Sequence, residues 1–199
     1  MNHSFYDKIL LASSSPRRVQ LLTQAGFDVR VLKGLQIDER YPDNLPINEI
    51  PKYLSALKAK AYATEARQLN LPLVAADTIV VLDGNVIGKP KNVDEAKRML
   101  ELLSGNWHTV ISGVTLIVNP QRTLSFSEIT KVKFDTLSKK SIDYYVENFH
   151  PLDKAGSYGI QEWIGLIGVE RIEGDFYNIM GFPINKFVKI YLSEFHSFV

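Results

Sequence analysis

In Lys8-Ile-Leu-Leu-Ala-Ser-Ser-Ser-Pro-Arg-Arg18, the most informative part of the sequence, an apolar run breaks into three serines and a proline just before two arginines. Ile9 to Ala12 has the length and composition of a buried strand. Ser15 and Pro16 are typical of a helix start, with serine as the N-cap and proline at the first helical position. The chain therefore predicts a strand that turns directly into a helix.

The first turn of this predicted helix carries Arg17 and Arg18, and Gly26 supplies its stop. A cation in a first turn costs roughly 0.3 to 1 kcal/mol, because the helix dipole already concentrates positive potential there. A bound anion reverses that sign, and serine hydroxyls, backbone amides and guanidinium groups together form a phosphate cradle. The alternative is an ordinary exposed first turn whose arginines point to solvent.

Composition limits the class of protein. The 199 residues, 45% of them hydrophobic, suit one large domain or two intimate lobes, and we expect a single domain over residues 1–199. A net charge of +1, from 23 basic and 22 acidic residues, provides no general attraction for nucleic acid or for an anionic membrane. The absence of cysteine excludes disulfides, thiol nucleophiles and Cys-ligated zinc. No segment has the pattern of a signal peptide or of a membrane span, so we expect a cytoplasmic location.

Periodicity and turn signals divide the rest of the chain into alternating helices and strands. The predicted elements after the first βα unit are a strand at Val29–Leu32, a surface loop at 38–46, a helix at Asn48–Arg67, a strand at Leu73–Leu82 that turns through Asp83-Gly84-Asn85 into a second strand, a helix opened by an Asn92/Glu95 capping box, a pair of strands at Thr109–Val118 and Leu124–Phe134, and helices that begin at Ser138 and Pro183. This order predicts an α/β fold with a mixed sheet.

Asp77 lies inside the apolar run Leu73–Leu82, where a carboxylate is costly unless it is paired, hydrogen-bonded or bound to a metal. A hairpin that pivots on Asp83-Gly84 sets Lys89 opposite Thr78, about one residue from the carboxylate. Two interpretations stay open here. Asp77 and Lys89 form a structural ion pair, or Asp77 holds a divalent ion or activates water while Lys89 holds a phosphate oxygen.

Three other features carry weaker signals. Lys58 and Lys60 flank the apolar stripe of the helix 48–67 on opposite edges, so helical geometry does not choose between them. The segment Asp153–Gln161 contains glycines that allow close backbone approach, and the Gln161 amide is able to read a base edge; the alternative is a glycine-containing turn that feeds another strand. The histidines show no metal-ligand spacing, which favours structural or surface roles for His3, His108, His150 and His196.

Taken together and in order, a set of short motifs resembles the Maf-like nucleotide pyrophosphatases over nearly the whole chain. These motifs are Leu11-Ala-Ser-Ser-Ser-Pro-Arg-Arg18, Ile37-Asp-Glu39, Lys58-Ala-Lys-Ala61, Ala75-Ala-Asp-Thr78, Gly88-Lys-Pro90, Leu103-Ser-Gly105, Asp153-Lys-Ala-Gly-Ser-Tyr-Gly-Ile-Gln161, Ile172-Glu-Gly174 and Gly181-Phe-Pro183. The resemblance implies an α/β fold with an elongated mixed sheet flanked by helices, and two lobes with a central cleft.

The resemblance also implies an activity, which is the hydrolysis of nucleoside triphosphates to the monophosphate and pyrophosphate with Mg²⁺ or Mn²⁺, in a house-cleaning role. It points to the dTTP and UTP type, possibly with modified pyrimidine nucleotides, and to a homodimer. Two alternatives stay open: the same chemistry on another base, such as a methylated guanine nucleotide, and a regulator of cell division that binds nucleotide without cleaving it.

Position by position, the resemblance assigns roles to nine residues. Asp77 corresponds to the catalytic carboxylate and, with Glu39, to the acidic pair for metal or water. Phosphate binding falls to Ser13, Arg17, Lys60 and Lys89, with Lys60 rather than Lys58 aligned to the family lysine. The positions that distinguish the dTTP and UTP type are Arg18, Thr78 and Gln161.

Two positions depart from the family pattern. Glu162 follows Gln161 where glycine is usual, and Asp175-Phe176 replaces a small residue and a tyrosine. Glu162 places a negative charge beside the predicted base-reading amide, so the departure bears on substrate preference more than on the reaction.

Overall fold

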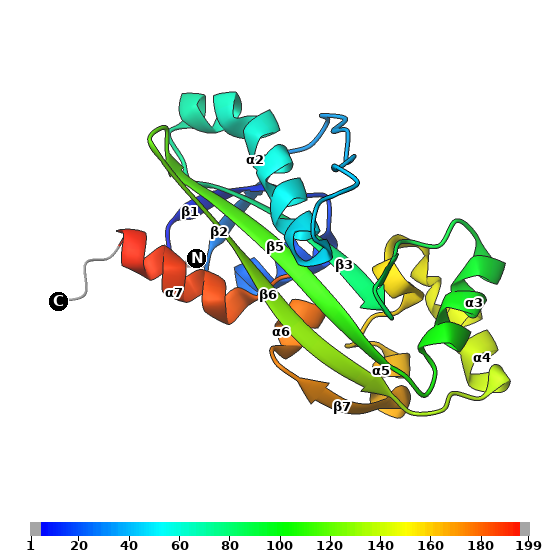
Figure 1. The fold of residues 1–199 in the computed structure, drawn as a ribbon. Helices are drawn as coiled ribbons and strands as arrows, with labels where there is room; N and C mark the ends of the chain where they lie inside the picture. Colours follow the sequence, from blue (N-terminus) through cyan, green and yellow to red (C-terminus); the bar gives the residue numbers. More distant parts are fainter. Residues whose placement is uncertain (1–4, 196–199) are drawn as a thin grey trace. The chain divides into compact units, whose positions relative to one another are not determined.

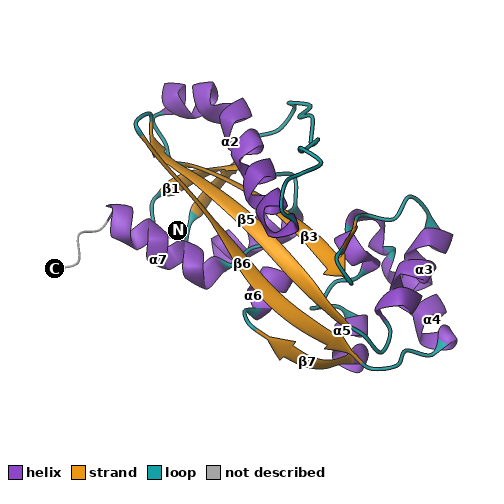
Figure 2. Cartoon of the chain, viewed as in Figure 1, coloured by secondary structure: helices purple, strands orange, loops and turns teal. Residues whose placement is uncertain are grey.

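A computed structural model of the chain describes residues 5–195, and its centre is a mixed β-sheet (Figures 1 and 2). The strands are β1 Lys8–Ala12, β2 Asp28–Val31, β3 Leu73–Leu82, β4 Asn85–Ile87, β5 Trp107–Asn119, β6 Arg122–Phe134 and β7 Val169–Glu173. Their order is β2-β1-β3-β5-β6-β7, with β4 paired to β3. β1 pairs in parallel with β2 and β3, whereas the β3–β4 and β6–β7 pairs are antiparallel. The predicted α/β fold with a mixed sheet is confirmed.

Seven helices accompany the sheet within the described residues. They are α1 Pro16–Gln24, α2 Ile50–Leu69, α3 Val93–Leu103, α4 Lys139–Phe149, α5 Trp163–Gly168, α6 Phe176–Ile179 and α7 Ile184–Phe195, with short 3-10 turns at Ile47–Glu49, Pro151–Asp153 and Ala155–Ser157.

The chain forms two compact units. Unit 2 consists of Thr78–Ile111 and Ile129–Met180, and unit 1 consists of the other described residues, 5–77, 112–128 and 181–195. The boundaries after Asp77, Ile111 and Glu128 fall inside the long strands β3, β5 and β6. Each of these strands therefore contributes residues to both units.

Unit 1 is built around β1, whose central residues are buried as expected of a parallel strand covered on both faces. One face of β1 and β3 packs against α2 in a cluster of Leu10, Ala12, Leu32, Ala59, Tyr62, Ala66, Leu73 and Ala75. α7 lies on the other side of these strands from α2 (Figure 1). There the Phe27 ring, just after α1, contacts the rings of Phe187 and Tyr191 at centroid distances of 5.5 and 4.9 Å.

The helices of unit 2 pack against one another. α3 contacts α4 and the 3-10 turn Ala155–Ser157, and α4 contacts α5. His108 on β5 is buried among Phe134 and Tyr158, and its Nε2 atom lies 2.7 Å from the Tyr158 hydroxyl. His108 therefore has a structural place in this unit, while His150 is exposed. His3 and His196 lie outside the described residues.

Capping and turn residues in the sequence predicted several helix starts and the hairpin, and the structure has them. The Asn92 side chain accepts from the Glu95 amide at 2.9 Å, as the capping box predicts, and the Ser138 hydroxyl caps α4 by accepting from the Ser141 amide. The hairpin ladder pairs Val81 with Val86, which is the predicted register.

Two differences from the predicted elements stand out. The long helix begins at Ile50 instead of Asn48, because a 3-10 turn over Ile47–Glu49 precedes it. The segment that ends at Gln161 leads into helix α5 before β7, where a strand directly after the turn is the alternative that the sequence leaves open.

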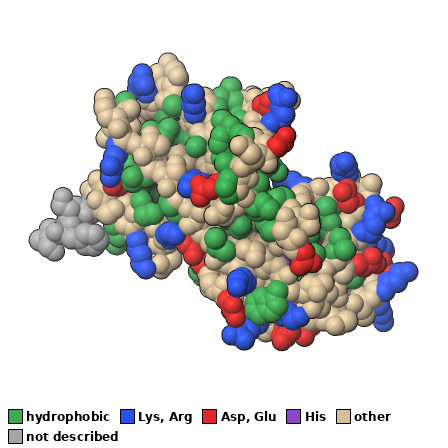
Figure 3. Space-filling view, viewed as in Figure 1, with side chains coloured by type: hydrophobic (Ala, Val, Ile, Leu, Met, Phe, Trp, Pro, Cys, Tyr) green, Lys and Arg blue, Asp and Glu red, His purple; other side chains and the backbone are tan. Residues whose placement is uncertain are grey.

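On the face of the molecule drawn in Figure 3, basic and acidic side chains are interspersed instead of being gathered by sign. This pattern matches the near-neutral charge of the sequence. Among the helices in residues 5–195, none combines the length and the hydrophobicity that a membrane crossing requires.

Candidate functional site

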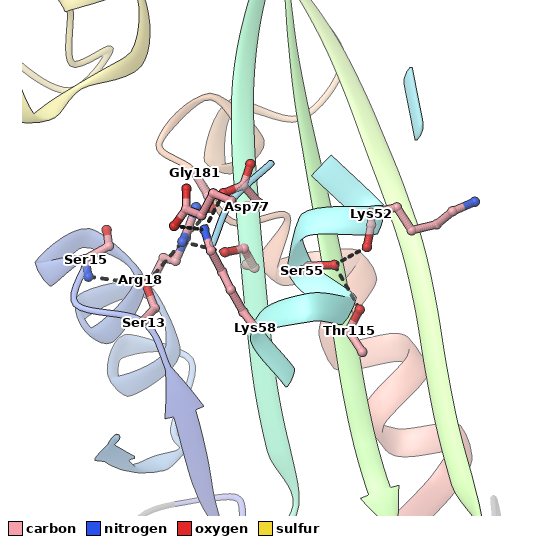
Figure 4. Close-up of polar contacts among 11 residues, drawn as sticks. Ser13, Ser15, Arg18, Lys52, Ser55, Lys58, Asp77, Thr115 and Gly181 are labelled. Atoms are coloured by element: carbon pink, nitrogen blue, oxygen red, sulfur yellow. Dashed lines mark hydrogen bonds and ion pairs between the residues drawn. The ribbon is translucent and has the colours of Figure 1, made fainter. Parts of the chain in front are cut away.

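The turn from β1 into α1 is organised by the Ser13 hydroxyl in unit 1. This oxygen accepts from the Ser15 amide at 3.2 Å and from Arg18 Nη1 at 3.1 Å (Figure 4). Ser15 is the N-cap residue, as predicted, but within the described part of the chain its hydroxyl makes no capping hydrogen bond. The amides of the first turn, which normally receive a cap, are thus not covered by that side chain.

Arg18 ties this turn to the strand that carries Asp77. Its guanidinium donates to the carbonyl oxygen of Ala76 at 2.7 Å and to that of Gly181 at 2.9 Å. Burial lowers the pKa of the Arg18 guanidinium, and the nearby Asp77 charge opposes that shift. Arg18 therefore holds the first turn of α1 against the residue that precedes Asp77. Its predicted role in distinguishing bases stays a prediction.

Asp77 is the centre of the polar cluster in unit 1. Lys58, from α2, donates to Asp77 Oδ1 at 2.5 Å (Figure 4). The same ammonium lies 3.1 Å from Glu39 Oε1. The side chains of Asp77 and Lys58 are only 12% and 13% exposed, whereas that of Glu39 is 56% exposed. Two carboxylates from distant segments therefore converge on one cation.

The lysine of α2 that reaches this cluster is Lys58. Lys60 is exposed, because two residues along a helix correspond to a rotation of about 200°, and its assignment to phosphate binding stays a prediction. An ion pair of Asp77 with Lys89 is one of the two interpretations that the sequence leaves open. Strand β4 ends at Ile87, two residues before Lys89, and the ion pair that Asp77 makes is with Lys58.

The contact of α2 with strand β5, called here the seat of α2, fixes where Lys58 lies. The Ser55 hydroxyl donates to the Lys52 carbonyl at 2.8 Å and lies 2.8 Å from Thr115 Oγ1 on β5. Gly113, also on β5, lies so close to the start of α2 that an added Cβ would be 2.2 Å from the Lys52 amide nitrogen. Helix backbone thus rests directly on strand backbone at Gly113. The sequence reasoning missed these contacts, although a glycine inside a strand is a signal of close backbone approach.

In unit 2, the structure joins two of the predicted motifs. The Gly156 amide donates to the Gly88 carbonyl at 3.0 Å, which links the segment Gly88–Pro90 to the segment that ends at Gln161. Lys89 and Gln161 are both exposed. Thr78 follows Asp77 on β3, and because side chains alternate along a strand it points to the opposite face.

Arg17 is partly buried in the first turn of α1. Its assignment to phosphate binding, like those of Ser13 and Lys89, stays a prediction.

Asp77 and Glu39 fit a divalent ion only in combination with a phosphorylated ligand. Their carboxylates meet at one cationic position, and Mg²⁺ in proteins is commonly held by one or two carboxylates together with substrate phosphates. Across residues 5–195, no group of three or more His, Asp or Glu side chains gathers as a metal cluster. Two carboxylates alone would leave most coordination positions of such an ion to other oxygen ligands.

This chain is similar to known proteins over most of its length. A dTTP/UTP pyrophosphatase of Phocaeicola vulgatus is 52% identical over 90% of this chain and 92% of its own length, and one of Cytophaga hutchinsonii is 48% identical over 94% of this chain and 84% of its own. Among solved structures, the Ham1 protein of Staphylococcus aureus resembles the fold with a TM-score of 0.51 at 13% identity, covering 94% of this chain and 98% of that one. The sequence model of the family described as Maf-like protein matches residues 8–194. The chain therefore belongs to the Maf-like protein family.

Proposed function

We propose that this protein hydrolyses dTTP and UTP to the nucleoside monophosphate and pyrophosphate. The observation that carries the proposal is the convergence of Asp77, Glu39 and Lys58 beside the serine and arginine turn of unit 1. The substrate class follows from the names of relatives that are about half identical over nine-tenths of the chain.

The reaction needs a base for water and cations for the phosphates. Water attacks the α phosphorus, a new P–O bond forms, and the bond from the α phosphorus to the bridging oxygen breaks to release pyrophosphate. Asp77 accepts the proton of the attacking water. Ser13 and Arg17 at the start of α1, and Lys89, hold phosphate oxygens, and Lys58 takes the place predicted for Lys60.

Asp77 and Glu39 would hold Mg²⁺ or Mn²⁺ in this site. When bound, the ion would neutralise negative charge on the phosphoryl oxygens and on the leaving pyrophosphate. Lys58 lies between the same two carboxylates and offsets part of their negative charge.

Base selection falls to Thr78 and Gln161, with Arg18 acting through the contacts that hold Ala76 and Gly181. The Gln161 amide both donates and accepts, which matches the O4 acceptor and N3 donor of uracil and thymine.

Pyrophosphate release tests the proposal directly. The purified protein is incubated with dTTP, UTP, CTP, GTP or methylated GTP and Mn²⁺ or Mg²⁺, with Asp77→Asn run alongside. We expect release from dTTP and UTP, and a loss of about 100-fold or more in the variant, because an amide does not accept the proton.

Two results would contradict it. Release from a guanine nucleotide alone would keep the reaction and discard the pyrimidine assignment. Binding of nucleotide without release from any of them, in either protein, would instead indicate a regulator.

A further inference from the structure

Glu162 follows the predicted base-reading Gln161, and its carboxylate is folded back into unit 2. The Glu162 amide donates to the Gly159 carbonyl at 3.0 Å, which closes a tight turn around Ile160 and Gln161. The carboxylate lies over Gly159 so closely that a Cβ there would be 2.6 Å from Glu162 Cδ. Gly159 thus leaves the room that the Glu162 side chain occupies.

Tyr145 of α4 holds both ends of this turn with one hydroxyl group. The oxygen accepts from the Gly159 amide at 2.9 Å, and the hydroxyl donates to Glu162 Oε2 in a short hydrogen bond. Tyr145 is fully buried. Burial, followed by the hydrogen bond to Glu162, raises the pKa of the Tyr145 hydroxyl, so it stays protonated and able to donate.

Lys154 neutralises the Glu162 charge. Its ammonium lies 3.2 Å from Glu162 Oε1 and 2.8 Å from Asp153 Oδ1. The Lys154 side chain is only 8% exposed and that of Glu162 21%, whereas Asp153 is 56% exposed. Without Glu162, the ion pair that the nearly buried ammonium keeps among the described residues is with the exposed carboxylate of Asp153, and such a change is costly.

Gln161 contrasts with its neighbours in this turn. Ile160 is 4% exposed and the Glu162 carboxylate is bound on both oxygens, whereas Gln161 is exposed. The turn therefore presents one amide side chain from a backbone that is anchored before and after it.

We propose that Glu162, clamped by Tyr145 and Lys154, is a positioning residue that fixes the Gln161 turn for recognition of the pyrimidine base. The inference rests on the proposed function and deepens it. Glu162 does not touch the reacting phosphates in this proposal, and it acts only through the placement of Gln161.

The physical reason lies in the symmetry of an amide. A freely moving glutamine pairs with the uracil edge in one orientation and with the cytosine edge in the flipped one, so discrimination requires that neighbours restrict it. A free carboxylate beside Gln161 would also compete for its NH₂ group. The contacts of Glu162 with Tyr145 and Lys154 occupy both carboxylate oxygens and remove that competition.

The test separates base recognition from triphosphate recognition. Steady-state kinetics give kcat and KM for UTP, and inorganic triphosphate, which has no base, gives an inhibition constant on the same enzyme. The variants are Glu162→Ala, which removes both contacts, Glu162→Gln, which keeps an acceptor for Tyr145, and Tyr145→Phe. Glu170→Gln, an exposed position on β7, is the matched control for loss of one charge.

We expect Glu162→Ala to raise KM for UTP about tenfold, with kcat and the inhibition constant of triphosphate changed by less than about threefold. Glu162→Gln should fall between Glu162→Ala and the wild type, and Glu170→Gln should match the wild type. If Glu162→Ala does not fold, Glu162→Gln and Tyr145→Phe carry the comparison.

A parallel change of KM and the triphosphate constant, or no change in either, would overturn the positioning role. A wild-type protein that releases no pyrophosphate from UTP or dTTP would instead overturn the proposed function itself. The two failures are therefore distinguishable.

Discussion

Lys58 is the residue on which the cluster in unit 1 depends. One ammonium faces two carboxylates, and its own side chain is 13% exposed, so both ion pairs lie in an environment that screens charge less than bulk water does. Removing the ammonium would take the ion-pair partner from Asp77, whose side chain is 12% exposed, and would leave less to offset its desolvation.

Substitution of the two α2 lysines should therefore give different results. We expect Lys58→Ala to lower kcat/KM for dTTP by about 100-fold, because a buried cation is lost from the carboxylate pair and from the phosphates. Lys60→Ala should stay within about twofold, because Lys60 is exposed. Steady-state kinetics on both variants check this, and a loss in Lys60→Ala as large as that in Lys58→Ala would contradict the expected difference.

The sequence singled out Asp77 but not the lysine that pairs with it, and the difference has a physical cause. A carboxylate in an apolar run is conspicuous, since it needs compensation whatever the rest of the fold does. The choice between Lys58 and Lys60 depends on which edge of α2 faces Asp77. That edge is set by contacts between residues about 60 positions apart, such as Ser55 with Thr115.

At the scale of elements, the seat of α2 on β5 is a contact between backbones. Gly113 allows it, because any side chain there would meet the main chain of Pro51 and Lys52. Main chain at the start of a helix cannot move aside as the end of a flexible side chain can. The placement of Lys58, on the same helix, depends on this seat.

A single methyl group should test the seat. We expect Gly113→Ala to lower the free energy of unfolding by about 3 kcal/mol, because the added carbon would lie 2.2 Å from backbone atoms and α2 would have to shift. Gly88→Ala is the matched control, since none of the described atoms lies within 4 Å of a Cβ there, and its effect should stay within about 0.5 kcal/mol. Urea unfolding of both variants measures the difference, and similar losses would contradict the backbone seat.

Elements with strong local signals were predictable, and elements without them were not. The strand and helix of the opening motif, the Asp83-Gly84 hairpin and the Asn92 cap each follow from chemistry within a few residues. α5 and α6 are six and four residues long, too short for a helical period to show. β7 is five residues long and its position depends on pairing with β6, so its own sequence does not predict a strand there.

At the scale of the whole molecule, buried His108 links stability to pH. Burial lowers the pKa of the His108 imidazole from its ordinary value of 6.5 to about 4. Between these two values the unfolded chain takes up a proton that the folded protein does not, so the folded state loses stability as the pH falls. The stabilisation is fully present above pH 6.5 and is lost progressively toward pH 4.

The size of this effect can be measured by difference. We expect the wild type to lose about 2 kcal/mol more of its free energy of unfolding between pH 7 and pH 5 than His108→Gln does. His150→Asn, at an exposed histidine, should follow the wild type. Denaturant titrations at both pH values measure the free energy of unfolding of each protein. Identical losses of this free energy in the wild type and His108→Gln would rule out His108 as the cause of the pH dependence.

The division of the chain into units has a consequence for how the gene can change. Unit 2 is encoded by two separate stretches and unit 1 by three, with junctions after Asp77, Ile111, Glu128 and Met180. A single recombination crossover exchanges everything downstream of one point, so at none of these junctions would it transfer one whole unit without part of the other. A crossover after Asp77, for example, would bring in all of unit 2 together with later segments of unit 1, including Gly181, which accepts a hydrogen bond from Arg18. A base preference acquired by such an exchange would therefore also replace part of the structure around the phosphate turn.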